Sequence, residues 1–380
     1  MLSKDNNLKA FFELVKAGLW EKEARLLSLG KVDFGEVMRL AEEQSVVGLV
    51  TAGLEHVQDV KMPKEVLLQY VGQSLQIEQR NVSMNTFIEA LYRRMQRENL
   101  YSILMKGQGI AQCYERPLWR TAGDIDLLLN GDNYDRAKEW FRTIGSVDEN
   151  ENEFRKRVNI TVDSWDVELH GTMRGQLGKR IERGIDEAQR SVFYGGNVRS
   201  WYNGRTTVFL PSADNDVIFI FTHILQHFFL GGIGLRQICD WCRLMWTYRE
   251  KLDLCELENR LRHMGLMSEW MAFGVLAVEY LGMPLEAVPL LDEYDNANIN
   301  HRLKRKAEKI LKYVMEVGNF GHNRNLTYKN EKPFLVRMLI SLRYRTSDFI
   351  RQVMVFPKDA IRAYWLLLMS GFRKLLKWKS

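Results

Sequence analysis

The sequence predicts an α+β protein in which a small mixed sheet stands between two helical regions. Between residues 80 and 212, short apolar strands alternate with glycine turns and helices, a pattern typical of an α/β core. Before and after that segment, apolar residues recur at helical spacing. We therefore expect an N-terminal helical region over 1–79, an α/β core over 80–212 and a C-terminal helical region over 213–380.

The flanking regions read as helices along most of their length. Helical spacing of apolar residues covers 8–80, and Pro63 marks the start of a helix over 64–98 because proline is favoured at the beginning of helices. No strand pattern of comparable strength occurs after residue 212. Four further helices are expected there: Val217–Phe229, Leu235–Trp246, Leu254–Met264 and Met267–Tyr280.

The core combines strands and helices in alternation. Each expected strand is a short run rich in apolar residues, and Asn130-Gly131 supplies a turn signal between two of the elements. The expected strands are Ile103–Met105, Asp124–Leu129, Glu153–Val158 and Ser164–His170, and the expected helices are Ile110–Tyr114 and Tyr134–Ile144.

Composition is that of an ordinary globular chain. The 380 residues are 46% hydrophobic and 27% charged, with 7 prolines, which argues against extensive disorder. The N-terminus lacks the apolar run of a signal peptide, and no uninterrupted apolar stretch is long enough to span a bilayer. The 4 cysteines do not suggest a disulfide framework. We therefore expect a cytoplasmic protein.

The basic charge is concentrated at the C-terminal end. Residues 331–380 hold 11 Lys/Arg and 3 Asp/Glu, a net charge of +8, which leaves 43 basic and 45 acidic residues in 1–330. A nucleic-acid partner for the whole protein is therefore not predicted. The segment Ala360–Lys379 is basic and amphipathic, and three roles remain open for it: peripheral contact with the inner membrane face, binding of single-stranded nucleic acid, or packing on its own domain.

The strongest candidate for chemistry is the run Gly123-Asp124-Ile125-Asp126-Leu127. Strand side chains alternate, so the two carboxylates lie on one face if this run is a strand. Adjacent carboxylates repel and are costly to bury without a cation. Mg²⁺ prefers oxygen ligands of this kind together with substrate phosphates. The run therefore predicts a divalent metal site.

A later strand offers a third carboxylate. Asp166, Glu168 and His170 alternate with apolar residues, so their side chains share one face of a strand. If this strand lies beside the Asp124 strand, Glu168 or Asp166 joins the pair. Three such carboxylates hold two metal ions roughly 3.5–4 Å apart in sites for in-line phosphoryl displacement.

A glycine turn upstream suits a phosphate. Lys106-Gly107-Gln108-Gly109 lies between an expected strand and an expected helix, where backbone N–H groups face outward. Lys106 and Arg120 could add positive charge against a triphosphate.

Each of these features also has an ordinary structural explanation. Two acidic residues in an apolar run, a Lys-Gly turn and an alternating strand are all common without a ligand. Their order along the chain favours the functional interpretation.

A zinc site is a further alternative, since His223 and His227 are followed by Cys239 and Cys242. The two cysteines lie in a helical pattern, however, so core packing is the preferred interpretation for them.

The chain resembles the nucleotidyltransferase superfamily with the DNA polymerase beta-like palm. More narrowly, it resembles an uncharacterised nucleotidyltransferase family often found among bacterial surface-polysaccharide genes. The resemblance extends over most of residues 8–250. The matching segments are Met105-Lys106-Gly107, Arg120 with Gly123-Asp124-Ile125-Asp126-Leu127-Leu128, Val167-Glu168-Leu169-His170, and a helical pattern of His223, His227, Gly234-Leu235-Arg236 and Asp240.

The resemblance implies a nucleotidyltransferase palm and assigns residues to roles. Asp124 and Asp126 match the paired metal ligands, Glu168 matches the third carboxylate, and Gly107 matches the phosphate-turn glycine. The implied cofactor is Mg²⁺ or Mn²⁺, as two ions. The implied reaction transfers a nucleoside monophosphate from a nucleoside triphosphate such as ATP to a hydroxyl acceptor and releases pyrophosphate. Gln108 departs from the pattern, since Gly or Ser usually follows the glycine.

The remaining matching residues are expected to face the substrate. His170, His223, His227, Arg236 and Asp240 belong to this group, together with the turn residues Gln108 and Gly109. An internal pair between Arg236 and Asp240 is an alternative, because these residues are one helical turn apart. A non-catalytic binding or assembly module that keeps the fold is the alternative to an enzyme, and the altered turn and basic tail motivate it.

Overall fold

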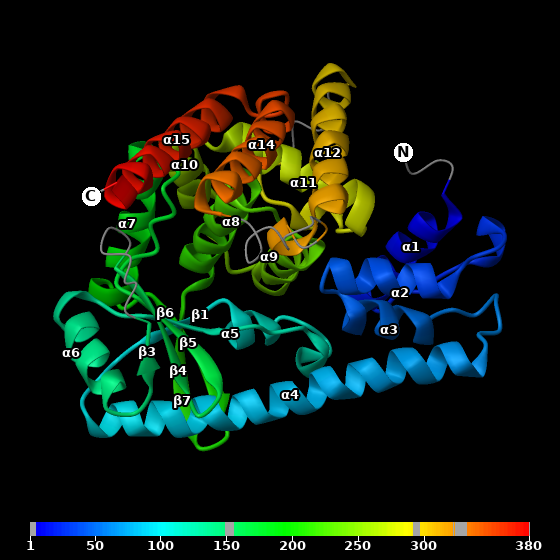
Figure 1. The fold of residues 1–380 in the computed structure, drawn as a ribbon. Helices are drawn as coiled ribbons and strands as arrows, with labels where there is room; N and C mark the ends of the chain where they lie inside the picture. The colour runs from blue at the N-terminus through cyan, green and yellow to red at the C-terminus, as the bar shows by residue number, and fades with distance from the viewer. Residues whose placement is uncertain (1–4, 149–155, 292–296, 322, 324–332, 380) are drawn as a thin grey trace.

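The computed structural model describes residues 5–148, 156–291, 297–321, 323 and 333–379. It shows a mixed sheet with a helical body beside it (Figure 1). The α+β class predicted from the sequence is confirmed. Among the described residues, we find no helix with the length and apolar character needed to cross a membrane.

The sheet contains five strands in the order β1-β2-β5-β4-β3. The central strands β2 and β5 are parallel, whereas the other pairs are antiparallel, which makes the sheet mixed. A parallel pair buried at the centre suits the apolar runs seen in both strands. The strands are β1 (Ile103–Met105), β2 (Ile125–Leu128), β3 (Ser146–Val147), β4 (Arg157–Val162) and β5 (Trp165–His170).

Helices and a hairpin surround the sheet. The long helix α4 (Lys64–Arg97) runs from the N-terminal helices along the sheet (Figure 1). Its buried residues pack with those of the strands in one apolar core. The other elements of this region are α5 (Gly107–Ala111), η2 (Pro117–Trp119), α6 (Gly131–Arg142), α7 (Lys179–Tyr194), and the hairpin β6 (Val198–Asn203) and β7 (Thr206–Pro211).

The helical body is built from both ends of the chain, whose buried residues form a single core. Trp20 donates a hydrogen bond from Nε1 to the carbonyl of Leu281 at 2.6 Å, and the side chain of Gln44 accepts one from the amide of Leu235 at 3.0 Å. The first part comprises α1 (Asn6–Trp20), η1 (Leu27–Leu29), α2 (Phe34–Glu43) and α3 (Val47–Glu55). The second comprises α8 (Ala213–Leu230), α9 (Leu235–Tyr248), α10 (Leu254–Met264), α11 (Met267–Leu281), η3 (Leu285–Ala287), α12 (Ala297–Val317), η5 (Asn319–Gly321), α14 (Phe334–Val353) and α15 (Pro357–Lys379).

Most predicted elements are confirmed. Strands β1, β2 and β5 and helices α4, α9, α10 and α11 lie within two residues of their predicted bounds, whereas α8 begins four residues before the predicted start at Val217. Strand β3, the β6–β7 hairpin and helix α7 were not predicted. The hairpin and α7 carried a signal: Asn203-Gly204 is a favoured start for a hairpin turn, and Ile181, Ile185 and Val192 follow helical spacing.

Two further predictions need comment. Of the strand predicted over Glu153–Val158, residues 153–155 lie outside the described residues, and β4 begins at Arg157. Helix α4 runs through the predicted boundary between residues 79 and 80 without a break. The division into three regions stays a prediction.

Candidate active site

Two carboxylates lie side by side on the central strands. Asp126 on β2 and Glu168 on β5 are register partners, so their side chains share one face of the sheet. Both are buried, whereas Asp124 directly precedes β2 and is exposed. All three carboxylates line the same cleft. Asp166 is exposed on β5, accepts a hydrogen bond from Thr161 and does not line the cleft.

Cations from the same wall neutralise the buried pair. The Lys106 Nζ lies 3.0 Å from Asp126 Oδ1. The His170 Nε2 lies 2.7 Å from Asp126 Oδ1 and 3.0 Å from Glu168 Oε2, so the imidazole bridges both carboxylates. Arg157 on β4 forms an ion pair with Glu168. Each buried carboxylate therefore has two cationic neighbours.

This pairing shifts the ionisation of the groups. Burial raises the pKa of Asp126, but Lys106 and His170 outweigh it and hold that pKa well below its usual range. Burial lowers the pKa of His170, but hydrogen bonds to Asp126 and Glu168 raise it overall and favour the protonated imidazole. Lys106 behaves likewise, since the carboxylates outweigh burial and raise its pKa. The Asp126 charge raises the pKa of Asp124.

The cleft has a second wall made by helices α8 and α9. It holds about 690 Å³ of empty space, part of it open to solvent at the mouth. The sheet region contributes Lys106, Gly107, Arg120, Gly123, Asp124, Asp126, Arg157 and Glu168. The helical body contributes Ile220, His223, Ile224, His227, Arg236, Gln237 and Asp240. The cleft therefore lies at the junction of the two regions.

Arg120 is held by Asp240. Its Nε and Nη2 donate to the two carboxylate oxygens of Asp240, both at 2.7 Å, and its Nη1 donates to the carbonyl of Thr121 at 3.3 Å. The hydroxyl of Tyr114 donates to Asp240 at 2.8 Å. This buried bidentate pair joins the loop before β2 to α9. The predicted pair between Arg236 and Asp240 is not formed, because Arg120 occupies both oxygens.

Arg236 lines the cleft without an ionic partner. Its Nη1 donates to the carbonyl of Thr121 at 2.9 Å, and its buried Nε has no hydrogen-bond partner. In the described part of the chain, no carboxylate lies within 4.0 Å of its guanidinium. Burial and the nearby Arg120 lower the pKa of Arg236. The more distant carboxylates of Asp240 and Asp124 offset part of this lowering, so Arg236 is a cation of the cleft without a direct ion pair among the described residues.

Two imidazoles stand on α8 beside it. The rings of His223 and His227 meet edge to face, with centroids 4.3 Å apart. Burial and the Lys106 charge lower the pKa of both residues, that of His227 to about 3. Both imidazoles are therefore neutral at pH 7, whereas the pKa of the bridging His170 is shifted in the opposite direction.

The glycine turn is strained, and its glutamine points away from the cleft. Lys106 and Gly107 both have positive φ, 53° and 39°, a conformation that is costly for lysine and is typical of functional sites. The Gln108 side chain is buried and donates from Nε2 to Asn81 Oδ1 at 2.8 Å. A Cβ at Gly109 would lie 2.7 Å from Leu210, so this glycine permits close packing of α5 on β7. Neither Gln108 nor Gly109 lines the cleft.

The match to a family agrees with this geometry. A model of the family described as "Uncharacterised nucleotidyltransferase" matches residues 30–282. The chain belongs to this family. No curated protein and no solved structure matches it.

The donor set of the cleft suits a divalent cation. Ligand atoms of Asp126, Glu168 and His170 lie within 4.8 Å of one another, and within the described ranges they form the one such group of metal-ligand side chains. Two carboxylates and a neighbouring Asp124 supply the oxygen ligands that Mg²⁺ and Mn²⁺ prefer. The residues present therefore fit a metal of this class.

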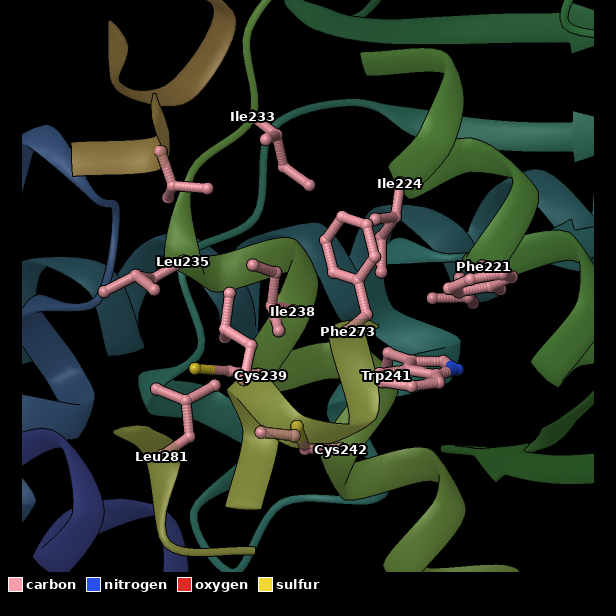
Figure 2. Close-up of a cluster of buried hydrophobic side chains, with 14 of the residues drawn as sticks. Phe221, Ile224, Ile233, Leu235, Ile238, Cys239, Trp241, Cys242, Phe273 and Leu281 are labelled. Carbon is pink, nitrogen blue, oxygen red and sulfur yellow. The ribbon is translucent and has the colours of Figure 1, made fainter. Parts of the chain in front are cut away.

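The zinc alternative finds no support in the described residues. Cys239 and Cys242 are buried in the core of the helical body, among Trp241, Ile238 and Leu281 (Figure 2). Burial raises the pKa of both thiols, which opposes the thiolate that zinc requires. His223 and His227 face the cleft instead.

Sequence reasoning missed Arg157 as a site residue. It stands opposite His170 in the β4–β5 register, and its side chain reaches Glu168. Its position in an expected strand was a partial signal. The order of the strands in the sheet, which brings Arg157 next to Glu168, was not predicted. Gln237 and the apolar Ile220 and Ile224 were missed as well, although Ile220 and Ile224 lie one helical turn before the expected His223 and His227 and therefore share their face of α8.

Proposed function

We propose that the protein is a metal-dependent nucleotidyltransferase that transfers a nucleoside monophosphate from a nucleoside triphosphate to a hydroxyl acceptor. The observation that carries the proposal is the in-register pair Asp126 and Glu168, joined by Asp124, in the cleft of a chain from this family. The acceptor oxygen forms a bond to the α-phosphorus. The bond from that phosphorus to the bridging oxygen breaks, pyrophosphate leaves, and the hydroxyl proton passes to solvent water.

Asp124, Asp126 and Glu168 are the residues that would hold Mg²⁺ or Mn²⁺, and we propose two ions by analogy with other two-metal sites. Such ions, when bound, neutralise charge that develops on the phosphoryl oxygens. Asp124 is best suited to take up a new partner, because it is exposed and lies next to the buried pair.

In this proposal, Lys106 and Arg236 bind the phosphates of the nucleotide. A phosphate contact was also expected for Arg120, but its guanidinium donates its hydrogen bonds to Asp240 and Thr121. Arg236 keeps an unpartnered Nε beside the cleft. A buried cation without a counter-charge is costly, and an anionic ligand removes that cost. We therefore assign Arg120 and Asp240 to positioning, and Arg236 to a triphosphate oxygen.

We propose that the hydroxyl acceptor binds against the residues of α8 that line the cleft. The neutral imidazoles of His223 and His227 can each accept a hydrogen bond from a hydroxyl. Ile220 and Ile224 offer apolar contact on the same helix. An acceptor hydroxyl bound here faces the carboxylates across the cleft. His170, in contrast, holds Asp126 and Glu168 in place.

The resemblance suggests surface-polysaccharide metabolism as the setting, with a sugar phosphate as one acceptor to test. A cytoplasmic location belongs to the same proposal, since nucleoside triphosphates are supplied there. Gln108 does not argue against triphosphate binding, because its side chain serves α4 rather than the cleft.

Calorimetric titration with each nucleoside triphosphate and Mg²⁺ tests the proposal. Asp124→Asn should abolish the Mg²⁺-dependent part of binding while the protein stays folded, since Asp124 is exposed. Asp166→Asn is the matched control, because Asp166 is an exposed carboxylate on the same sheet outside the cleft. Equal loss in both variants, or binding unchanged in Asp124→Asn, contradicts the metal assignment.

A non-catalytic nucleotide-binding or assembly module is the second candidate. One observation favours it: Lys106, His170 and Arg157 already neutralise Asp126 and Glu168, so the buried pair is stable without a metal. Metal-dependent pyrophosphate release in the presence of any hydroxyl acceptor would exclude this candidate. Nucleotide binding without release across a broad acceptor panel would favour it.

A further inference from the structure

The helices α14 and α15 present an apolar surface to solvent. They pack against each other through the stacked rings of Phe349 and Tyr364, 4.4 Å between centroids, and through a hydrogen bond of 2.7 Å between the hydroxyls of Thr346 and Tyr364. We refer to the pair as the C-terminal hairpin; it lies at the edge of the molecule far from α4 (Figure 1). Its exposed apolar side chains are Val336, Leu339, Leu342, Ile350, Met354, Ile361, Trp365, Leu366 and Met369.

These side chains are not scattered. On α14, Leu339, Ile350 and Met354 follow helical spacing and form one stripe. On α15, Ile361, Trp365 and Met369 are each four residues apart and form a second stripe. Leu339 is 62% exposed and Trp365 is 64% exposed. Two such stripes on paired helices exceed the single exposed apolar residues that are normal on a soluble surface.

The opposite face of the C-terminal hairpin packs against the helical body. Gln352 donates from Nε2 to the carbonyl of Phe228 at 2.6 Å, which fixes α14 to the end of α8. Phe356, Ala360 and Ala363 are buried in the core of the helical body. Packing on its own domain therefore accounts for the inner face and leaves the outer stripes without a partner among the described residues.

The charges of the hairpin identify the kind of partner. Arg337, Arg343, Lys358 and Arg362 are exposed. The hairpin sequence contains two carboxylates, Asp348 and Asp359, and both are buried. Its outer surface is therefore apolar and cationic without an exposed acidic side chain. Helix α15 continues to Lys379, and the sequence adds Arg373, Lys374, Lys377 and Lys379 to it.

We propose that the outer face of the C-terminal hairpin binds an anionic lipid surface. Apolar stripes enter the headgroup region, and the flanking cations bind the lipid phosphates, as in helices that lie in a membrane interface. A second copy of the chain is a poorer occupant, because two like-charged faces would meet. Single-stranded nucleic acid is poorer as well, since its bases stack on aromatic rings and the exposed stripes carry one, Trp365.

Vesicle sedimentation with the full chain tests the proposal. We expect binding to vesicles of equal parts phosphatidylglycerol and phosphatidylcholine and little binding to phosphatidylcholine alone. The triple variant Leu339→Glu, Ile350→Glu, Trp365→Glu should lose this binding. The variant Arg343→Gln, Lys358→Gln should weaken it roughly tenfold or more, because each cation near an anionic surface contributes about fivefold.

The matched control places the same change on another exposed helix. Leu68→Glu and Leu75→Glu alter exposed apolar residues of α4, and binding should be unchanged. Equal binding to both vesicle types, equal loss in the control, or binding that survives the triple variant overturns the proposal. The proposal is also overturned if the wild-type protein sediments as a dimer without binding vesicles and the triple variant is a monomer. Circular dichroism and thermal unfolding establish that each variant is folded.

Discussion

The two walls of the cleft differ in how their charged side chains are paired. On the sheet wall, Asp126 and Glu168 each have cationic partners within their own sheet region. On the helical wall, Arg236 faces the cleft without a carboxylate within 4.0 Å among the described residues, and His227 is neutral at pH 7. The buried carboxylates of the sheet wall are therefore paired without a ligand, whereas Arg236 on the helical wall has no ion-pair partner among the described residues.

Under the proposed function, this difference separates residues that hold the site together from residues that bind the substrate. Breaking a buried ion pair costs stability, because one charge is left without a partner. Removing a cation that has no partner costs little and affects ligand binding instead. Variants on the two walls should therefore differ in which quantity they change.

The largest effect is expected from Glu168→Gln on the sheet wall. It removes a proposed metal ligand and the partner of Arg157 and His170. Pyrophosphate release should fall on the order of 10³-fold, as when a central electrostatic group is removed from an active site. Activity within a few-fold of wild type would mean that the sheet wall is not catalytic.

A pH-dependent prediction extends the comparison to the helical body. Burial and the neighbouring Asp359 raise the pKa of Glu269 to about 8, the reverse of the shift at Asp126. The folded state then binds a proton that the unfolded state releases above its ordinary pKa. Stability should therefore fall by about 4 kcal/mol between pH 4.5 and pH 8 on account of this group.

Urea unfolding at several pH values measures this slope. Glu269→Gln should remove most of it, since the amide does not titrate. A wild-type stability that rises through this interval, with the same rise in the variant, would contradict the assignment.

Arg120→Gln should mainly affect stability. The change leaves the buried carboxylate of Asp240 without its bidentate partner, which costs about 3 kcal/mol. Thermal unfolding measures the loss. If Arg120→Gln unfolds at the wild-type temperature but fails to bind the triphosphate, Arg120 is a ligand-binding residue and our division of the walls is wrong.

Arg236→Gln should show the converse behaviour. Loss of a hydrogen bond to a charged group weakens triphosphate binding roughly tenfold or more, while the free energy of unfolding stays near that of the wild type. Calorimetry with inorganic triphosphate and with the nucleotide separates phosphate contacts from base contacts. An unchanged affinity together with reduced stability would assign Arg236 to structure.

The smallest effect is expected from Gln108→Ala. The change leaves Asn81 Oδ1 without its donor and should cost about 1 kcal/mol in stability. Nucleotide affinity should not change, since Gln108 faces α4. A large drop in affinity at unchanged stability would restore Gln108 to the substrate site.

The side-chain register of the sheet wall could largely be predicted from the sequence. On the helical wall, the family resemblance indicated His223, His227, Arg236 and Asp240, which do line the cleft, but the contacts of these residues could not be predicted. The alternation that places Asp126 and Glu168 on one face is local, so it is visible in each strand. The partner of Asp240 depends on packing between residues 120 positions apart, and spacing alone favoured the wrong arginine. Likewise, the direction of Gln108 follows from the packing of α5 on α4, which no local pattern records.

The contact between Trp20 and Leu281 joins residues 261 positions apart. The first helices of the chain pack on one another, but they also share their core with α9 and α11, so part of their apolar surface has no packing partner until those helices have been synthesised. At typical elongation rates this takes roughly 13 to 50 s. The nascent N-terminal helices therefore expose apolar surface for that period, and chaperone binding during translation should concentrate on them.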